Sequence, residues 1–147
     1  MDRKKEIAAL VGLIFGAAAV YFFMYYLPSS NSSVEESLSA AAETMNKSMP
    51  MQVDQETRLD SVGTLPGKVM VYYNTLVNVS IAYGEGDLDT NLVKEQLEPI
   101  MQDAIASDDN LKAMRDTECT FLYKYRDAEG AYLFSIAISP EKYNREL

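Results

Sequence analysis

The strongest constraint on the fold is one long apolar run near the start of the chain, IAALVGLIFGAAAVYFFMYYL. It covers residues 7–27 without a charged side chain. A helix of that length reaches about 30 Å, the thickness of the hydrocarbon core of a bilayer. A lone segment in lipid must satisfy its own backbone polar groups, which favours a helix. The run therefore predicts a single transmembrane helix over residues 7–27, preceded by a short tail over residues 1–6.

Basic residues lie on one side of this run only. Arg3, Lys4 and Lys5 precede it, and the first basic residue after it is Lys47. The positive-inside rule then predicts a membrane protein with a cytoplasmic N-terminus and a C-terminal domain on the far side of the bilayer. A cleaved signal peptide is the alternative, with Ala17-Ala18-Ala19 as a small-residue cleavage site, and the sequence leaves retention or cleavage open.

Small residues recur every four positions within the apolar run, at Ala8, Gly12 and Gly16. Such spacing lets a second helix approach closely, and it predicts pairing with another helix or homo-oligomerisation. The alternative is that small residues are simply common in membrane helices.

Charge and composition narrow the functions of the rest of the chain. The protein has 13 basic and 22 acidic residues, of which the first 27 residues hold three and two, so the remaining domain carries −10. An acidic domain lacks the basic side chains that contact nucleic-acid phosphates, so no nucleic-acid partner is expected. A cationic protein partner fits this charge, although solubility alone also explains it. Histidine is absent and Cys119 is the single cysteine, which removes the commonest catalytic and metal-binding pairs.

The pattern after the apolar run predicts one domain. A polar linker, residues 28–33, precedes a domain over residues 34–147. Helices are expected after the capping box that begins at Ser33 and after Asp89, with Pro99 kinking or dividing the second helix. Strands are expected at 57–62, 68–79, 118–126 and 131–139. The predicted fold class is α+β: an N-terminal transmembrane helix followed by a two-layer domain with an antiparallel sheet, in the order α-β-β-α-β-β.

A candidate partner surface follows from the alternation in the strand at 68–79. Val69, Val71 and Tyr73 point one way, and a semi-apolar set points the other way. An open sheet face of this kind would bind a partner, unless the first helix covers it. Arg58 and Asp60 share a face of the preceding strand and could bind a ligand, or form an exposed ion pair of little consequence. The predicted surface consists of Arg58, Asp60, Met70, Tyr72, Asn74, Leu76, Leu122 and Leu133.

The middle of the chain resembles a family of small uncharacterised bacterial exported or membrane-anchored proteins. The resemblance rests on Met49-Pro50, Val53-Asp54, Thr57-Arg58-Leu59-Asp60-Ser61, Pro66-Gly67 and Tyr73-Asn74-Thr75-Leu76-Val77-Asn78. It implies a bacterial extracytoplasmic domain and no enzyme activity. Together with the predicted membrane helix, it implies a protein of the bacterial inner membrane whose C-terminal domain is periplasmic or external. Members often carry cysteines where this chain has Asp108-Asp109 and Pro140-Glu141, so the disulfide that such a pair implies has no counterpart here.

No residue is assigned to catalysis, to a metal or to a cofactor. Asp87-Leu88-Asp89 lacks the remaining ligands of a calcium loop, and helix capping explains Asp89 better. The prediction is therefore a non-enzymatic protein-interaction module, an accessory subunit of a bacterial envelope complex. One alternative is an acidic inhibitor or immunity-type binder of a cationic envelope enzyme or toxin. A more distant alternative is a carboxylate-dependent hydrolase.

Overall fold

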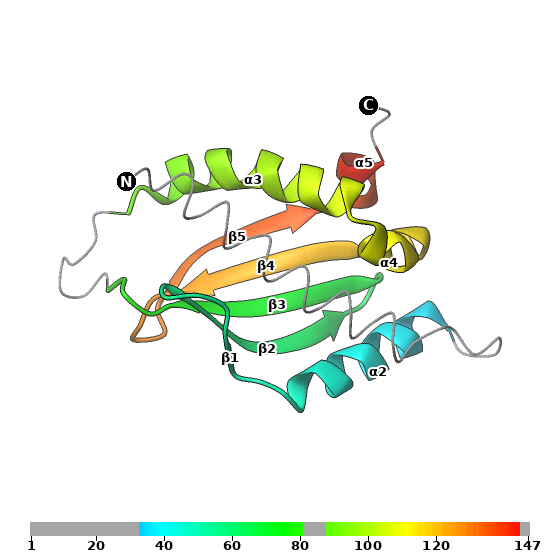
Figure 1. Ribbon diagram of the computed structural model, residues 1–147, viewed down its shortest axis with the longest axis horizontal. Coiled ribbons are helices and arrows are strands. Elements are labelled where there is room, and N and C mark those ends of the chain that lie inside the picture. The colour runs from blue at the N-terminus through cyan, green and yellow to red at the C-terminus, as the bar shows by residue number, and fades with distance from the viewer. Residues whose placement is uncertain (1–32, 81–87, 145–147) are drawn as a thin grey trace.

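The computed structural model describes residues 33–80 and 88–144 as one α+β domain (Figure 1). Its helices are α2 (Val34–Asn46), α3 (Thr90–Ser107), the short 3-10 helix η1 (Asp109–Leu111), α4 (Lys112–Asp116) and α5 (Pro140–Tyr143). Its strands are β1 (Met51–Gln52), β2 (Thr57–Leu65), β3 (Val69–Leu76), β4 (Thr120–Arg126) and β5 (Tyr132–Ile138).

The five strands form one sheet in the order β1-β2-β3-β4-β5. Every neighbouring pair is antiparallel except β3 and β4, which are parallel. The expectation of an antiparallel sheet is therefore wrong, and the sheet is mixed. The reason is topological: the 18-residue α3 carries the chain back along the sheet, so β4 starts at the same end as β3 (Figure 1).

The two long helices begin where the capping residues predict. At the start of α2, Ser33 Oγ accepts the backbone N–H of Glu36, and the Glu36 carboxylate accepts that of Ser33. At the start of α3, the Asp89 carboxylate accepts the N–H groups of Asn91 and Leu92. These caps satisfy amide groups that have no partner inside the helix. Pro99 does not divide α3 into two helices, because the helix is continuous from Thr90 to Ser107.

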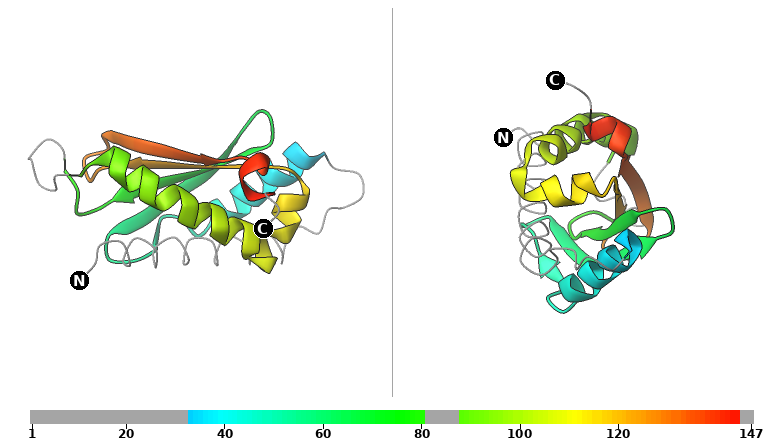
Figure 2. Two further views of the ribbon diagram at one scale, coloured as in Figure 1. Left: turned by 90° about the horizontal axis from the view of Figure 1, so that it is seen from above. Right: turned by 90° about the vertical axis from the view of Figure 1, so that its right-hand side faces the viewer.

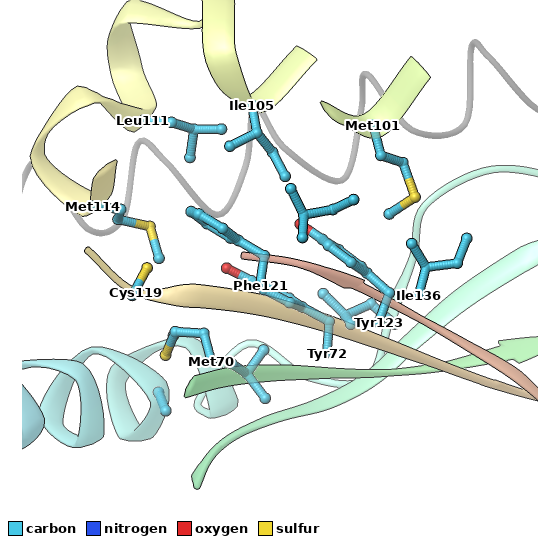
Figure 3. Close-up of a cluster of buried hydrophobic side chains, with 14 of the residues drawn as sticks. Met70, Tyr72, Met101, Ile105, Leu111, Met114, Cys119, Phe121, Tyr123 and Ile136 are labelled. Atoms are coloured by element: carbon cyan, nitrogen blue, oxygen red, sulfur yellow. The ribbon is translucent and has the colours of Figure 1, made fainter. Parts of the chain in front are cut away.

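The helices pack on one face of the sheet and enclose the core (Figure 2). Tyr72 and Tyr123 stack with ring centroids 4.8 Å apart, and Figure 3 shows both beside Phe121 and Ile136 under the helices. The Tyr143 hydroxyl donates to the buried Cys119 carbonyl at 2.7 Å, which ties α5 to the start of β4. The buried side chains of the helices that complete this core are Leu38, Ala41, Ala42 and Met45 from α2, Leu97, Met101 and Ile105 from α3, and Leu111 and Met114.

The predicted tail, membrane helix and linker fall outside this description, as do the helix-pairing residues Ala8, Gly12 and Gly16. Across 33–80 and 88–144, the helices are all too short or too polar to cross a bilayer. The expected fold class is thus corrected in two respects: the sheet is mixed, and the described fold contains no membrane-spanning helix.

Candidate interaction surface

The side of the sheet that faces away from the helices is called the outer face here. Alternation along each strand decides which side chains reach it, because neighbouring residues point to opposite faces. Strand pairing then aligns these residues in rows across the sheet. Successive rows are about 7 Å apart, since each strand residue advances about 3.3 Å. The first row holds Arg58, Thr75, Arg126 and Tyr132; the second holds Ser61, Tyr73, Lys124 and Ser135; the third holds Gly63, Val71, Leu122 and Ala137.

Half of the predicted partner surface lies on the core side of the sheet instead. Met70, Tyr72 and Asn74 are at most 1% exposed, and Leu76 is partly buried against the core. Figure 3 shows Met70 and Tyr72 among the core side chains. These four residues therefore cannot line an exposed face, and the predicted surface is corrected to the opposite side of β3. The physical reason is that α2 and α3 cover this side.

The two predicted leucines lie apart from each other. Leu122 is on the outer face, beside Val71 and Ala137 in the third row. Leu133 falls at an irregularity in the pairing of β4 with β5 and packs partly against the core. The same irregularity brings Tyr132 opposite Arg126, on the outer face, although strict alternation along β5 would put it on the side of Phe134 and Ile136.

Asp60 lies on the outer face beside Arg58, as the sequence predicted, because residues two apart on a strand share a face. A bulge follows in β2: Leu59 pairs with Asn74 and Ser61 pairs with Tyr73, so Asp60 is the extra residue between them. The bulge interrupts strict alternation and brings Ser61 to the outer face as well.

Asp60 is the centre of a hydrogen-bonded cluster that joins three strands. Its Oδ1 accepts from Arg58 Nε at 2.6 Å, and its Oδ2 accepts from Thr75 Oγ1 at 2.6 Å and from Arg126 Nη2 at 3.1 Å. Arg126 Nε also donates to Thr75 Oγ1 at 3.1 Å. We call Arg58, Asp60, Thr75 and Arg126 the arginine cluster. It links β2, β3 and β4 across the parallel pair.

The electrostatics of the arginine cluster keep Asp60 ionised and both guanidinium groups accessible. Partial burial raises the pKa of Asp60, but the hydrogen bonds from Thr75 and Arg58 and the charges of Arg58 and Arg126 outweigh it, and the pKa is lowered. The side chains of Arg58 and Arg126 remain 40% and 48% exposed, while that of Asp60 is 12% exposed. Two cations thus share one anion, and the cluster keeps a net positive charge.

Beyond the arginine cluster, the outer face holds two tyrosines, the polar residues Ser61, Lys124 and Ser135, and a third row of small or aliphatic residues. Tyr73 is 36% exposed and Tyr132 is 65% exposed. An added Cβ at Gly63 would lie 3.5 Å from the Tyr73 ring, so this ring extends over the glycine. Val71 is fully buried, yet it does not belong to the core between sheet and helices. The face therefore combines a basic row with tyrosines and small or aliphatic side chains.

The predicted surface omitted Thr75, Arg126 and Lys124, and also the exposed Tyr73 and Tyr132. No local pattern pairs Thr75 with Asp60, 15 residues earlier. The polar alternation Thr120, Lys124 and Arg126 in β4 was available as a signal. These residues of β4 can be aligned with the polar residues of β2 only once the parallel register of β3 and β4 is known.

The half-buried Asp54 and the buried Asp127 bind backbone groups close to them in the sequence. Asp54 Oδ1 accepts the N–H groups of Glu56 and Thr57 at 2.6 and 2.9 Å, and Asp127 Oδ1 accepts those of Glu129 and Ala131 at 3.0 and 2.8 Å. Both residues therefore stabilise turns. Among the residues that the structure describes, no group of three or more Asp, Glu or Cys side chains is arranged to hold a metal ion.

Comparison with known proteins finds a matching family for the sequence and similar solved structures for the fold. A family model described as a domain of unknown function, DUF8479, matches residues 32–134. No curated protein sequence matches the chain.

Three solved structures share the fold. The pilotin EpsS of the Vibrio vulnificus type 2 secretion system superposes with a TM-score of 0.57 at 10% identity, covering 77% of this chain and 94% of EpsS. A protein of Pseudomonas aeruginosa described as secreted gives 0.53 at 12% identity, covering 78% and 100%. The type II secretion system pilotin AspS of Vibrio cholerae gives 0.52 at 10% identity, covering 74% and 91%. At such low identities the similarity establishes the fold alone.

The predicted localisation is corrected by these findings. The described part of the chain has no helix that could span a membrane, and one neighbour of the same fold is described as a secreted protein. The expectation of an integral inner-membrane protein is therefore not retained.

Proposed function

The chain belongs to the DUF8479 family, and we propose that it is a non-enzymatic protein-interaction module, an accessory component of bacterial envelope machinery that binds its partner through the outer face of the sheet. The fold supports the first part of this proposal, because two of the similar structures are pilotins of type 2 secretion systems. The similarity is an analogy of fold and names no partner for this chain.

The observation that carries the proposal is the composition of the outer face. Tyr73 and Tyr132 are exposed there beside Arg58 and Arg126. Tyrosine and arginine are enriched among the residues that dominate binding at protein interfaces. Both arginines are held in place by Asp60 and Thr75. Ordering these side chains before binding lowers the entropy lost on association.

The two alternative functions have less support. A carboxylate-dependent hydrolase needs an acid whose pKa is raised, whereas the cluster around Asp60 lowers its pKa. An acidic inhibitor of a cationic protein was inferred from the charge of the whole domain. The outer face itself carries Arg58, Lys124 and Arg126 against the single carboxylate of Asp60, so its local charge is positive.

Site-specific photo-cross-linking in the cells that produce the protein tests this proposal. A photoreactive amino acid would replace Tyr73 in one variant and Asp103, an exposed residue of α3, in a control variant. We expect one dominant adduct from position 73, absent from position 103, that mass spectrometry identifies as a component of an envelope complex. Equal adducts at both positions, or no adduct at position 73, would refute the proposal.

A further inference from the structure

We propose that the outer face recognises an acidic segment of a partner protein, with a partner carboxylate held between Arg58 and Arg126 and neighbouring apolar side chains seated over Leu122 and Ala137. This inference rests on the proposed function and adds the chemistry of the partner. It follows from donors that the arginine cluster leaves unused, from the order of the rows, and from the charges around them.

The first step concerns hydrogen-bond donors. Arg58 donates through Nε alone, and Arg126 donates through Nε and Nη2. Both Nη groups of Arg58 and the Nη1 group of Arg126 therefore make no hydrogen bond within the described chain. A guanidinium group presents its donors in a planar fork that matches the two oxygens of a carboxylate. Asp60 fixes both forks at the surface and neutralises only one of the two charges.

The second step concerns the order of the rows. The arginine cluster lies in the first row, Tyr73 and Lys124 in the second, and Val71 and Leu122 in the third. The face thus changes from basic to apolar over about 13 Å, two row spacings. Ala137 ends the third row on β5, is exposed and has a small side chain, which leaves room there for apolar groups of the partner, whereas the Tyr73 ring covers Gly63 at the other end. A peptide with a carboxylate at one end and aliphatic side chains beyond it matches this order.

The third step concerns the surrounding charge. Glu56 comes just before β2, and Glu129 lies in the loop between β4 and β5, so both are at the end of the sheet that holds the arginine cluster. The chain as a whole has a net charge of −9. A polyanion such as a nucleic acid or an anionic membrane would meet this negative charge over a wide area. A single carboxylate within an apolar segment would meet only the arginines, and a protein segment therefore fits better.

The test uses the full chain with the photoreactive residue at position 73 and compares three further substitutions. Arg126→Gln removes one fork, Arg126→Lys keeps the charge but not the fork, and Lys112→Gln is the control, because Lys112 is an exposed cation paired with Asp116 on α4. Removing one member of an interfacial charge pair weakens binding by about tenfold or more. We expect Arg126→Gln to reduce the adduct about tenfold, Arg126→Lys to reduce it less, and Lys112→Gln to leave it unchanged. Circular dichroism of each variant verifies that it folds.

Peptide mapping of the adduct completes the experiment. The cross-linked partner segment should contain an aspartate or glutamate, and changing that residue to lysine should restore the adduct when Arg126 is changed to Glu. An unchanged adduct in Arg126→Gln, or a mapped segment without an acidic residue, would overturn the inference while the proposed function stands. The absence of any adduct would refute both. An adduct between two copies of this chain, or Arg126-dependent flotation with phosphatidylglycerol vesicles, would also overturn the inference.

Discussion

Replacing Asp60 by asparagine tests whether the arginine cluster holds the sheet together. The substitution keeps the shape of the side chain and removes its charge. Asp60 loses two ion pairs with partly exposed arginines, each worth about 0.2–1 kcal/mol because solvent screens them. The hydrogen bond from the buried Thr75 hydroxyl also loses its charged acceptor, which costs about 1 kcal/mol. We therefore expect Asp60→Asn to lower the free energy of unfolding by about 2 kcal/mol, or about 8 °C in Tm for a domain of this size.

The pH dependence of this effect has a definite sign. The folded-state pKa of Asp60 is lowered, because the hydrogen bonds and arginine charges outweigh the effect of burial. A lowered pKa contributes stability that is fully present above the unfolded-state pKa and is lost as the pH falls through the folded-state pKa. The difference in stability between wild type and Asp60→Asn should therefore be constant above about pH 5 and should shrink below about pH 4.

Urea unfolding of the full chain, followed by far-UV circular dichroism at about pH 7 and again at about pH 3, measures both quantities. The matched control is Asp116→Asn, which removes the exposed pair that Lys112 and Asp116 form at 2.7 Å on α4. That change should cost no more than about 0.5 kcal/mol. The reasoning is wrong if Asp60→Asn lowers the free energy of unfolding no more than the control does. It is also wrong if the loss at acidic pH equals the loss at neutral pH.

Three further predictions concern other side chains of the domain. Asn46 donates to the Val62 carbonyl at 2.7 Å and accepts the Val62 N–H at 2.8 Å, so Asn46→Asp, which loses the donor, should lower the free energy of unfolding in urea by about 1–3 kcal/mol. Tyr143→Phe leaves the buried carbonyl of Cys119 without its donor and should cost about 1–3 kcal/mol in the same assay, against no measurable change for Tyr73→Phe at the surface. Burial raises the pKa of Cys119 to about 11, so iodoacetamide should label this thiol only after unfolding, and labelling of the native chain within minutes would contradict its burial.

Local patterns predicted the helices and most strands because short-range physics determines them. The capping box at Ser33 and the cap at Asp89 satisfy backbone groups within one turn, so neither depends on the rest of the fold. Pro99 was expected to kink or divide its helix, but α3 runs without a break from Thr90 to Ser107 and packs against β5 and α5. Tertiary packing of this kind outweighs the local cost of a proline inside a helix.

The sidedness of β3 could not be read from its sequence, because both faces of this strand are largely apolar. Val69, Val71 and Tyr73 alternate with Met70 and Tyr72, and either set could face a core. The helices decide between them, and they cover the side of Met70 and Tyr72. Residues paired between β3 and β4 point to the same face of the sheet. Phe121 and Tyr123 therefore join the core, while Leu122 and Lys124 face outward.

The arginine cluster depends on two long-range features at once, which explains why the sequence revealed only Arg58 and Asp60. The pairing of β2 with β3 must bring Asp60 within reach of Thr75, and the parallel register must bring Arg126 level with Thr75. An antiparallel β4 would bring its opposite end beside Thr75, and Arg126 would lie at the far end of the sheet. The crossover through α3 therefore does more than cover the core. It determines which cation from the second half of the chain meets Asp60, and hence the basic end of the outer face.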